Sequence, residues 1–257
     1  MEQPFSHFDW GINYVKQLHS VDSCGIIKVV CGQTQKGVPM KKITIITGHY
    51  GSGKTNLAVN LALRLADAGE KVTVVDFDIV NPYFRTADFA GLFESHGITL
   101  AASMYANTSL DIPAISFDME RMAYEPGYLI VDVGGDDAGA IGLGRYAEGF
   151  SAYVPDQLDM WYVINRYRYL TEEPGETLTL MREIEAVSRM RHTGIVNNSN
   201  LGRETTAQTI LDALPYAEEI AKQAQLPLAY TTYREDLRIN VPDPLPVQVY
   251  VKPVWEQ

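Results

Sequence analysis

Residues 43–55 read ITIITGHYGSGKT, an apolar run rich in β-branched residues followed by Gly-x-x-x-x-Gly-Lys-Thr. Leucines recur every fourth residue after it, at Leu57, Leu61 and Leu65, which is typical of a helix. A glycine-rich turn between a buried strand and a helix gathers backbone N–H groups at the positive end of the helix dipole. The stretch therefore predicts a P-loop that holds the phosphates of a nucleotide.

The residues of this loop have separate expected roles. Glycines allow the tight turn, and Lys54 brings a mobile cation to the β- and γ-phosphates, a catalytic role. The hydroxyl of Thr55 is a predicted ligand of Mg²⁺. The predicted nucleotide-binding residues of the loop and the first helical turn are Gly48, Gly51, Ser52, Gly53, Lys54, Thr55 and Asn56.

Strands and helices alternate along the chain from Met40 onward. This order predicts a three-layer α/β/α fold, a mostly parallel sheet of seven or eight strands with helices on both faces. The carboxyl ends of its strands share one edge, where ligands bind. The expected strands are 43–47, 71–76, 98–102, 128–132, 159–165, 193–198, 227–230 and an edge strand at 247–251. The expected helices are 54–68, 85–96, 117–124, 138–152, 176–190, 204–214 and 216–224, the last two parted by Pro215.

Two acidic segments follow expected strands. Asp76 and Asp78 stand just past the second strand, where they could align an attacking water, and Asp76 could serve Mg²⁺. A later apolar strand ends in Asp132, the Walker B pattern whose aspartate holds Mg²⁺, and Gly135 follows with a backbone N–H that could sense the γ-phosphate. The alternative interpretations are a solvated acidic turn and a buried strand that merely ends in a turn.

Two further polar residues follow strands in the same way. Asn198 could present its amide to a base edge, since the group both donates and accepts; an Asn-rich turn is the alternative. Arg85 could reach a phosphate or be an ordinary surface arginine.

These motifs together resemble the MinD/ParA/CobQ group of P-loop nucleotide-binding proteins, over about residues 40–230. Residues 75–85 especially resemble MinD-like ATP-binding proteins. The resemblance implies binding of ATP, dependence on Mg²⁺ and often a nucleotide-controlled homodimer. It assigns phosphate and Mg²⁺ to Lys54 and Thr55, Mg²⁺ and water to Asp76 and Asp78, Mg²⁺ to Asp132, and adenine to Asn198.

The chain departs from this family at three places. His49 stands where many members have a lysine that reaches the partner's nucleotide across a dimer. No cysteine follows Met40, so we expect no iron–sulfur cluster in this part of the chain. The proline-rich tail lacks the basic amphipathic helix by which some members bind membranes.

The composition limits the classes of partner and the compartment that we expect for this protein. The formal net charge is −11, and an acidic surface repels nucleic acid and anionic membranes, so neither is an expected partner. The first ten residues lack the pattern of a signal peptide, and the only cysteines are Cys24 and Cys31, which favours a reducing cytoplasm. A metal site of these cysteines with His19 is conceivable, although its spacing matches no common zinc pattern.

Residues 1–39 differ from the rest because they lack the alternating pattern. We expect them to be an extension outside the natural fold, with Met40 as the natural start and residues 40–257 as the nucleotide-binding domain. A genuine N-terminal appendage is the alternative.

Three functions fit these motifs. The leading hypothesis is a cytoplasmic Mg²⁺-dependent ATP-binding protein that hydrolyses ATP slowly, and so is an ATPase, and acts as a switch toward a protein partner. The second is an ATP-dependent ligase or kinase of the CobQ or dethiobiotin-synthetase type, which phosphorylates a small carboxylate. The third is a module that holds nucleotide without turning it over.

Overall fold

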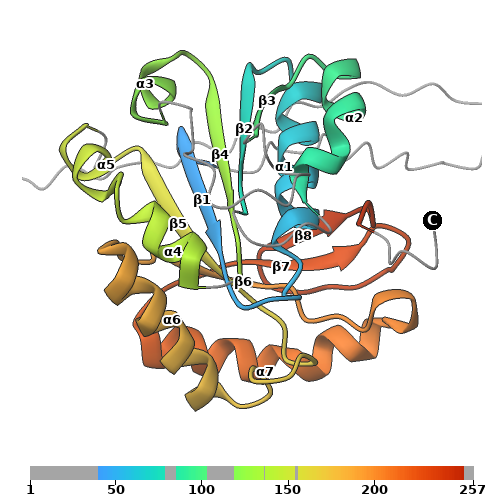
Figure 1. Cartoon of the computed structure of the whole chain (residues 1–257). Coiled ribbons are helices and arrows are strands. Elements are labelled where there is room, and N and C mark those ends of the chain that lie inside the picture. The colour runs from blue at the N-terminus through green and yellow to red at the C-terminus, as the bar shows by residue number, and fades with distance from the viewer. Residues whose placement is uncertain (1–39, 79–84, 103–118, 136, 154–155, 252–257) are drawn as a thin grey trace, which may run out of the picture. The chain divides into compact units, whose positions relative to one another are not determined.

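The computed structural model describes residues 40–78, 85–102, 119–135, 137–153 and 156–251 (Figure 1). The chain divides into two units, Met1–Lys36 and Gly37–Gln257, and every described residue belongs to the second. The predicted extension at residues 1–39 therefore lies outside the described residues, as do residues 79–84 and 103–118.

The described residues form the predicted parallel sheet, which has eight strands in the order β3-β2-β4-β1-β5-β6-β7-β8. All neighbouring pairs are parallel. The strands are β1 Ile43–Thr47, β2 Val72–Phe77, β3 Thr99–Ala102, β4 Tyr128–Val133, β5 Leu158–Ile164, β6 Gly194–Asn197, β7 Leu228–Arg234 and β8 Pro244–Val247.

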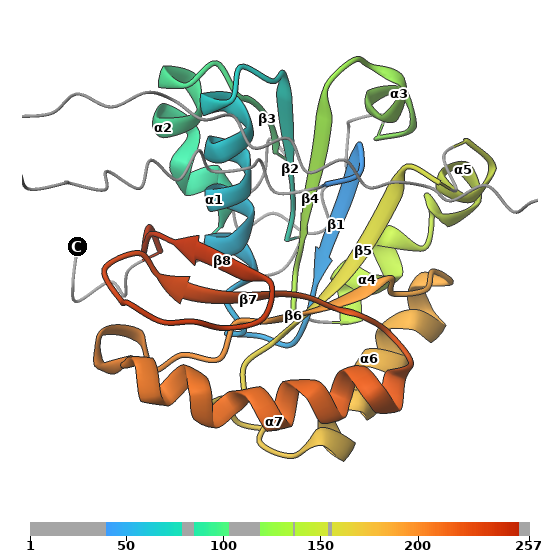
Figure 2. The same cartoon turned by 180° about the vertical axis from the view of Figure 1, so that it is seen from behind.

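Helices cover both faces of this sheet, which confirms the three-layer α/β/α fold (Figures 1 and 2). On one face, α1 and α2 pack against residues such as Ile46 and Val74. The other face, with Ile45 and Tyr162, is covered by the remaining helices. The helices are α1 Lys54–Asp67, α2 Ala90–Ser95, α3 Met119–Tyr124, α4 Asp137–Leu143, α5 Ala147–Tyr153, α6 Pro174–Ser188 and α7 Ala207–Ala224, with short 3₁₀ turns at η1 Thr86–Phe89 and η2 Gly202–Glu204.

The central position of β1 in the sheet determines which residues surround the loop that follows it. All five residues of β1 are buried, as expected for a strand covered on both faces, and β1 lies between β4 and β5. In the register of the sheet, Ile46 pairs with Asp132, and Asp132 also pairs with Asp76 of β2. The polar strand ends predicted from the sequence are therefore neighbours at one edge.

The predicted break at Pro215 is wrong, because α7 runs through it without interruption. A proline inside a helix removes one hydrogen bond and costs roughly 3 kcal/mol. Here the residues after the proline, among them Tyr216 and Ile220, are buried in the same core as Ile210 before it. Burial of these side chains on both sides offsets the local cost.

Three other predicted elements have different bounds. The expected helix 138–152 is two helices, α4 and α5, because the chain turns at Gly144, whose Cβ position would lie 2.9 Å from the carbonyl oxygen of Val187. The expected helix 85–96 begins as the 3₁₀ turn η1. The edge strand is β8 at 244–247 rather than 247–251, since the chain after Val247 follows helix α1 instead of β7.

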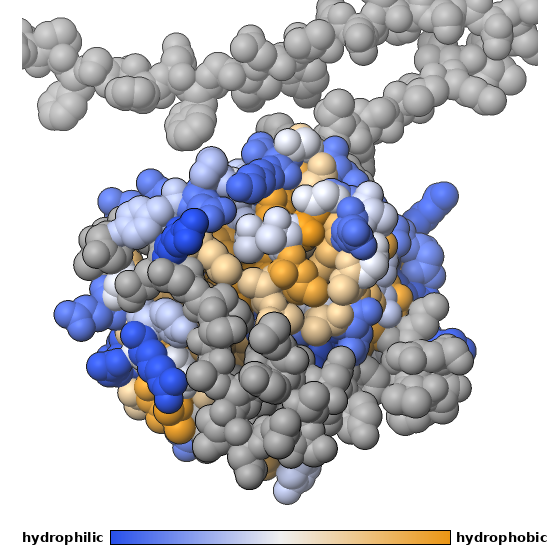
Figure 3. Space-filling view, turned by 45° about the horizontal axis from the view of Figure 1, so that its top comes forward, coloured by the Kyte–Doolittle hydropathy of each residue, from blue (hydrophilic) through white to orange (hydrophobic). Residues whose placement is uncertain are grey.

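The surface of the described residues is mixed. Figure 3 shows apolar side chains gathered in the middle of the face that it turns forward, with hydrophilic side chains around them. Among the helices that the structure describes, none combines the length and the apolar character needed to cross a membrane.

Candidate nucleotide site

The loop between β1 and α1 turns at the carboxyl end of the central strand. Gly48 and Gly53 adopt φ values of 147° and 91°, which disfavour other residues. A Cβ at Gly48 would lie 2.4 Å from the carbonyl oxygen of Val163 on β5, so the loop sits directly on the neighbouring strand. Ser52 is buried, and its hydroxyl has no hydrogen-bond partner among the described residues.

Lys54 begins α1 and turns back over the loop. Its side chain is largely buried, and its Nζ donates to the carbonyl oxygen of His49 over 3.2 Å. Gly135 approaches the same place from the end of β4: a Cβ there would lie 2.8 Å from the Lys54 Nζ and 2.7 Å from the Tyr50 nitrogen. The loop after β4 therefore touches the P-loop, and any side chain at Gly135 would block this contact.

His49 contributes no fixed cation. Burial lowers the pKa of its imidazole below the usual 6.5, and the nearby Lys54 acts in the same direction, although a backbone hydrogen bond to Tyr50 opposes the change. Its Nδ1 is buried without a hydrogen-bond partner among the described residues. The imidazole is therefore neutral near pH 7.

The predicted magnesium residues Thr55 and Asp132 lie together. The Thr55 hydroxyl donates to Oδ2 of Asp132 over 2.8 Å. Burial raises the pKa of Asp132 to about 7; the neighbouring Asp76 adds to the rise, while Lys54 and the Thr55 hydroxyl oppose it. Oδ1 of Asp132 is buried with no hydrogen-bond partner among the residues that the structure describes.

Asp76 is close to Asp132 in the sheet but is occupied by other partners. Its Oδ1 accepts a hydrogen bond from Nη2 of Arg85 over 3.0 Å and its Oδ2 accepts one from Nε over 3.1 Å. The backbone N–H groups of Asp78 and Ala87 also donate to this carboxylate. Arg85 is buried in this ion pair, which places its guanidinium on a carboxylate rather than at the surface. The catalytic and metal roles of Asp76 stay predictions.

Asp78, the second predicted catalytic carboxylate, lines the cavity described below. A Cβ at Gly134 would lie 2.9 Å from its Oδ1, so this carboxylate lies against the chain that leaves β4. The segments after β2 and β4 are thus in contact beside the P-loop.

Asn198 is hydrogen-bonded to the P-loop. Its Nδ2 donates to the carbonyl oxygen of Ser52 over 2.6 Å, and its Oδ1 accepts a hydrogen bond from the Thr232 hydroxyl. A Cβ at Gly53 would lie 2.2 Å from this Nδ2, which explains a glycine there. Asn198 also lines the cavity, and its contact with adenine stays a prediction.

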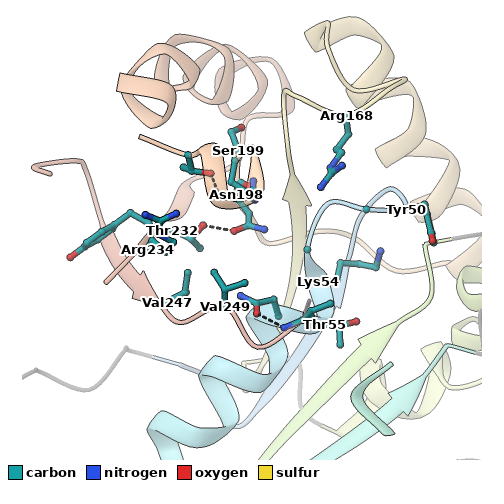
Figure 4. Close-up of a pocket in the computed structure, with 18 of the residues that line it drawn as sticks. Tyr50, Lys54, Thr55, Arg168, Asn198, Ser199, Thr232, Arg234, Val247 and Val249 are labelled. Atoms are coloured by element: carbon teal, nitrogen blue, oxygen red, sulfur yellow. Dashed lines mark hydrogen bonds between the residues drawn. The ribbon is translucent and has the colours of Figure 1, made fainter. Parts of the chain in front are cut away.

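A cavity of about 440 Å³, large enough for a nucleotide, lies beside the P-loop (Figure 4). It extends from the P-loop past the ends of β6 and β7 to the segment after β8. The predicted residues that line it are Gly51, Gly53, Lys54, Thr55, Asn56, Asp78, Gly135 and Asn198.

The sequence reading missed Arg168, which also lines the cavity. It follows β5 in an exposed turn and points toward the P-loop in Figure 4. A Cβ at Gly51 would lie 3.7 Å from its Nε. Among the described residues, its guanidinium has no acidic or hydrogen-bonding partner, whereas Arg234 on the same cavity is paired with Asp236. Arg168 could have been identified from the sequence, because it follows the carboxyl end of a predicted strand, where ligands bind in parallel sheets.

The donor set fits Mg²⁺. The residues that the structure describes contain no group of three or more His, Cys, Asp or Glu side chains placed to hold a metal ion. Mg²⁺ needs no such cage, because it binds one or two protein oxygens together with phosphate oxygens and water. The Thr55 hydroxyl and the unpaired Oδ1 of Asp132 supply oxygens of this kind.

Comparisons with known proteins agree with the motif. The ParA family model, described as NUBPL iron-transfer P-loop NTPase, matches residues 39–120. The antiactivator FleN of Pseudomonas aeruginosa is 49% identical over 41 residues, which are 16% of this chain and 15% of FleN. The match therefore spans a small part of that relative.

Two solved structures share the fold. FtsY from Mycoplasma mycoides has a TM-score of 0.50 and 18% identity over 75% of this chain and 59% of its own. Chloroplast FtsY from Physcomitrella patens has a TM-score of 0.50 and 17% identity over 77% of this chain and 60% of its own. At these identities the likeness concerns the architecture alone.

Proposed function

We propose that this chain, whose P-loop region matches the ParA family model and part of FleN, is a P-loop NTPase of the MinD/ParA type that binds ATP with Mg²⁺, hydrolyses it slowly, and controls a protein partner through the bound nucleotide. The observation that carries the proposal is the hydrogen bond between Thr55 and Asp132, because Thr55 and the neighbouring Lys54 both line a cavity of nucleotide size. Oxygens suited to Mg²⁺, a lysine suited to phosphate and a cavity with room for a nucleoside thus lie together, and this supports the proposal.

The residues of the chain have defined tasks in this reaction. The amides of the P-loop and Lys54 bind the β- and γ-phosphates and stabilise the charge that moves to the β-phosphate as the γ-phosphorus–oxygen bond breaks. The Thr55 hydroxyl and the Asp132 carboxylate would hold Mg²⁺, which would supply positive charge to neutralise the phosphates. Asp78 lines the cavity where a carboxylate could orient the attacking water.

The contacts between loops suit a switch. Gly135 touches the P-loop at Tyr50 and Lys54, and Gly134 lies against Asp78. A γ-phosphate held by Lys54 would therefore meet the segments after β2 and β4 together. Its loss on hydrolysis removes a shared contact, which is how nucleotide switches change shape. FleN is named an antiactivator, and a protein of that kind acts on another protein, which supports a protein partner.

Calorimetry with the full chain tests the proposal. We expect ATP with Mg²⁺ to bind and Lys54→Ala to abolish binding, because the main phosphate cation is lost. Lys71→Ala is the matched control, since Lys71 is an exposed lysine paired with Glu125. Absence of ATP binding by the unaltered protein, or equal binding by Lys54→Ala, would overturn the assignment.

Turnover separates the switch from the other functions. We expect single-turnover hydrolysis of bound ATP, and acceleration by a protein from the source cell. Acceleration by a small carboxylate with its phosphorylation would instead identify a ligase or kinase. Bound ATP that is never hydrolysed would identify a passive binding module.

A further inference from the structure

The chain after β8 is bound to helix α1 by asparagine side chains. We call residues 248–251 the strap. Asn60 donates to the carbonyl oxygen of Gln248 over 2.9 Å, and the nitrogen of Gln248 donates back to Oδ1 of Asn60 over 2.8 Å. Asn56 repeats the pattern one turn earlier, where its Oδ1 accepts from the nitrogens of Tyr250 and Val251 over 2.8 and 3.3 Å.

These bonds replace those that a neighbouring strand would give. An asparagine side chain carries the same amide group as the backbone, so two of them can satisfy an extended segment. Asn60 is 4% exposed, and both polar atoms of its side chain bind Gln248, while its Nδ2 also donates to the carbonyl oxygen of Asn56. The strap is therefore fixed by the first two turns of the helix that begins at the P-loop.

The strap alternates its side chains as a strand does. Tyr250 packs away from the cavity, with its ring edge-on to Phe89 at a centroid distance of 6.5 Å. Val249 and Val251 line the cavity, next to Val247 of β8. Figure 4 shows Val247 and Val249 pointing into the cavity, with Thr232 and Asn198 across from them and Lys54 to one side.

This apolar wall needs an apolar occupant. Lys54 and the loop amides account for the phosphates, so the part of a nucleotide that remains is the nucleoside. Valine side chains cannot bind phosphate, but they pack well against the flat face of a base. Val249 is 43% exposed, so an occupant could cover a large part of its surface.

We infer that the strap forms the wall on which the nucleobase packs, and that Asn56 and Asn60 position it there. This inference rests on the proposed function and identifies the part of the site that reads the nucleoside. Asn56, which binds the strap, directly follows Thr55, which we propose to act at the phosphates through Mg²⁺. The strap and the phosphates are therefore held by consecutive residues. Binding of a base and ordering of the strap are then coupled, each favouring the other.

The test compares a ligand with a base to one without. ATP and inorganic tripolyphosphate, each with Mg²⁺, are titrated into the full chain carrying Val249→Ala. We expect ATP to bind about threefold to tenfold more weakly, from the loss of apolar contact, and tripolyphosphate to bind within twofold of the unaltered protein. Val187→Ala is the control, since Val187 is 40% exposed on α6. It should change neither affinity.

Amide hydrogen exchange gives an independent readout. ATP should slow exchange at the nitrogens of Tyr250 and Val251, whereas tripolyphosphate should leave it unchanged. Unchanged ATP affinity in Val249→Ala, equal weakening of both ligands, or equal protection by both would overturn the inference while leaving ATP binding intact. An unaltered protein that binds tripolyphosphate but no ATP would overturn the inference and the proposed function together.

Discussion

The hydroxyl of Thr55 donates a 2.8 Å hydrogen bond to the carboxylate of Asp132, a residue 77 positions later in the chain. The first residue lies in the first turn of α1, the helix after β1, and the second stands near the end of the adjacent β4. The pair therefore links the P-loop to the Walker B strand. Thr55 shares one oxygen of Asp132 and leaves the other, Oδ1, without a partner among the described residues.

Removal of either partner should remove the contribution of Mg²⁺ to ATP binding. For Thr55→Ala and Asp132→Asn we expect the affinity for ATP measured with Mg²⁺ to fall about tenfold, to the value measured in EDTA. Thr179→Ala changes an exposed threonine on α6 and should retain the full effect of Mg²⁺. A normal response to Mg²⁺ in both site variants would show that these oxygens do not serve the metal.

Arg168 should contribute to hydrolysis. Its guanidinium has no acidic partner among the described residues and lies beside Gly51, so it can approach the charge that develops on the phosphates. We expect Arg168→Ala to lower single-turnover hydrolysis by at least about tenfold. Arg182→Ala, an exposed change on α6, should have no effect. Equal hydrolysis rates in Arg168→Ala and Arg182→Ala would show that Arg168 does not contribute to hydrolysis.

Arg85 should be needed for stability. It is 4% exposed and paired with the buried Asp76, which itself lies beside Asp132 in the sheet. Arg85→Ala would leave a buried carboxylate without its counter-charge, and we expect a loss of about 3–5 kcal/mol in the free energy of unfolding. Urea denaturation measures it, with the exposed Arg145→Ala as control. A loss no larger than that of the control would contradict the pairing.

Glu185 should stabilise the protein in a pH-dependent manner. Hydrogen bonds from His192 chiefly, and from Arg191, lower the pKa of Glu185 from 4.5 to about 2, although partial burial opposes them. Since the folded pKa is the lower one, the stabilisation is complete above about pH 4.5 and is lost as the pH falls toward 2. At pH 7 we expect Glu185→Gln to cost about 1–2 kcal/mol, after allowance for solvent screening.

Urea denaturation from pH 7 to pH 3 checks this expectation. The difference between Glu185→Gln and the unaltered protein should shrink as the pH falls, whereas the exposed Glu183→Gln on the same helix should show little difference at any pH. A difference that stays constant with pH would show that the ionised form of Glu185 is not what stabilises the fold.

Local chemistry made much of this molecule predictable. The strand, glycine turn and helix at residues 43–67 are specified by consecutive residues, and Asp132 was identifiable because an apolar strand ends at it. Parallel topology then brought Asp132 to Thr55. Elements that depend on distant packing were missed: α7 continues through Pro215 because residues on both sides of it are buried.

The rest of the site depends on contacts that leave no local pattern. Asn56 reads as a nucleotide-binding residue because it follows the P-loop, yet its side chain binds Gln248 and Tyr250 near the other end of the chain. From the sequence, Arg85 could equally be a surface arginine or a phosphate-binding one, and only the fold shows that it pairs with Asp76. Such pairings need the tertiary structure.

The prolines of β8 determine what the outer border of the sheet can accept. Asp243 and Val247 accept hydrogen bonds from β7 and the residue that follows it, so the intervening Pro244 and Pro246 point their nitrogens outward. Neither nitrogen carries a hydrogen, and Arg64 already occupies the outward carbonyl of Pro246. A strand of another chain could therefore form few backbone hydrogen bonds with the outer edge of β8. This protects the sheet against edge-to-edge aggregation at β8.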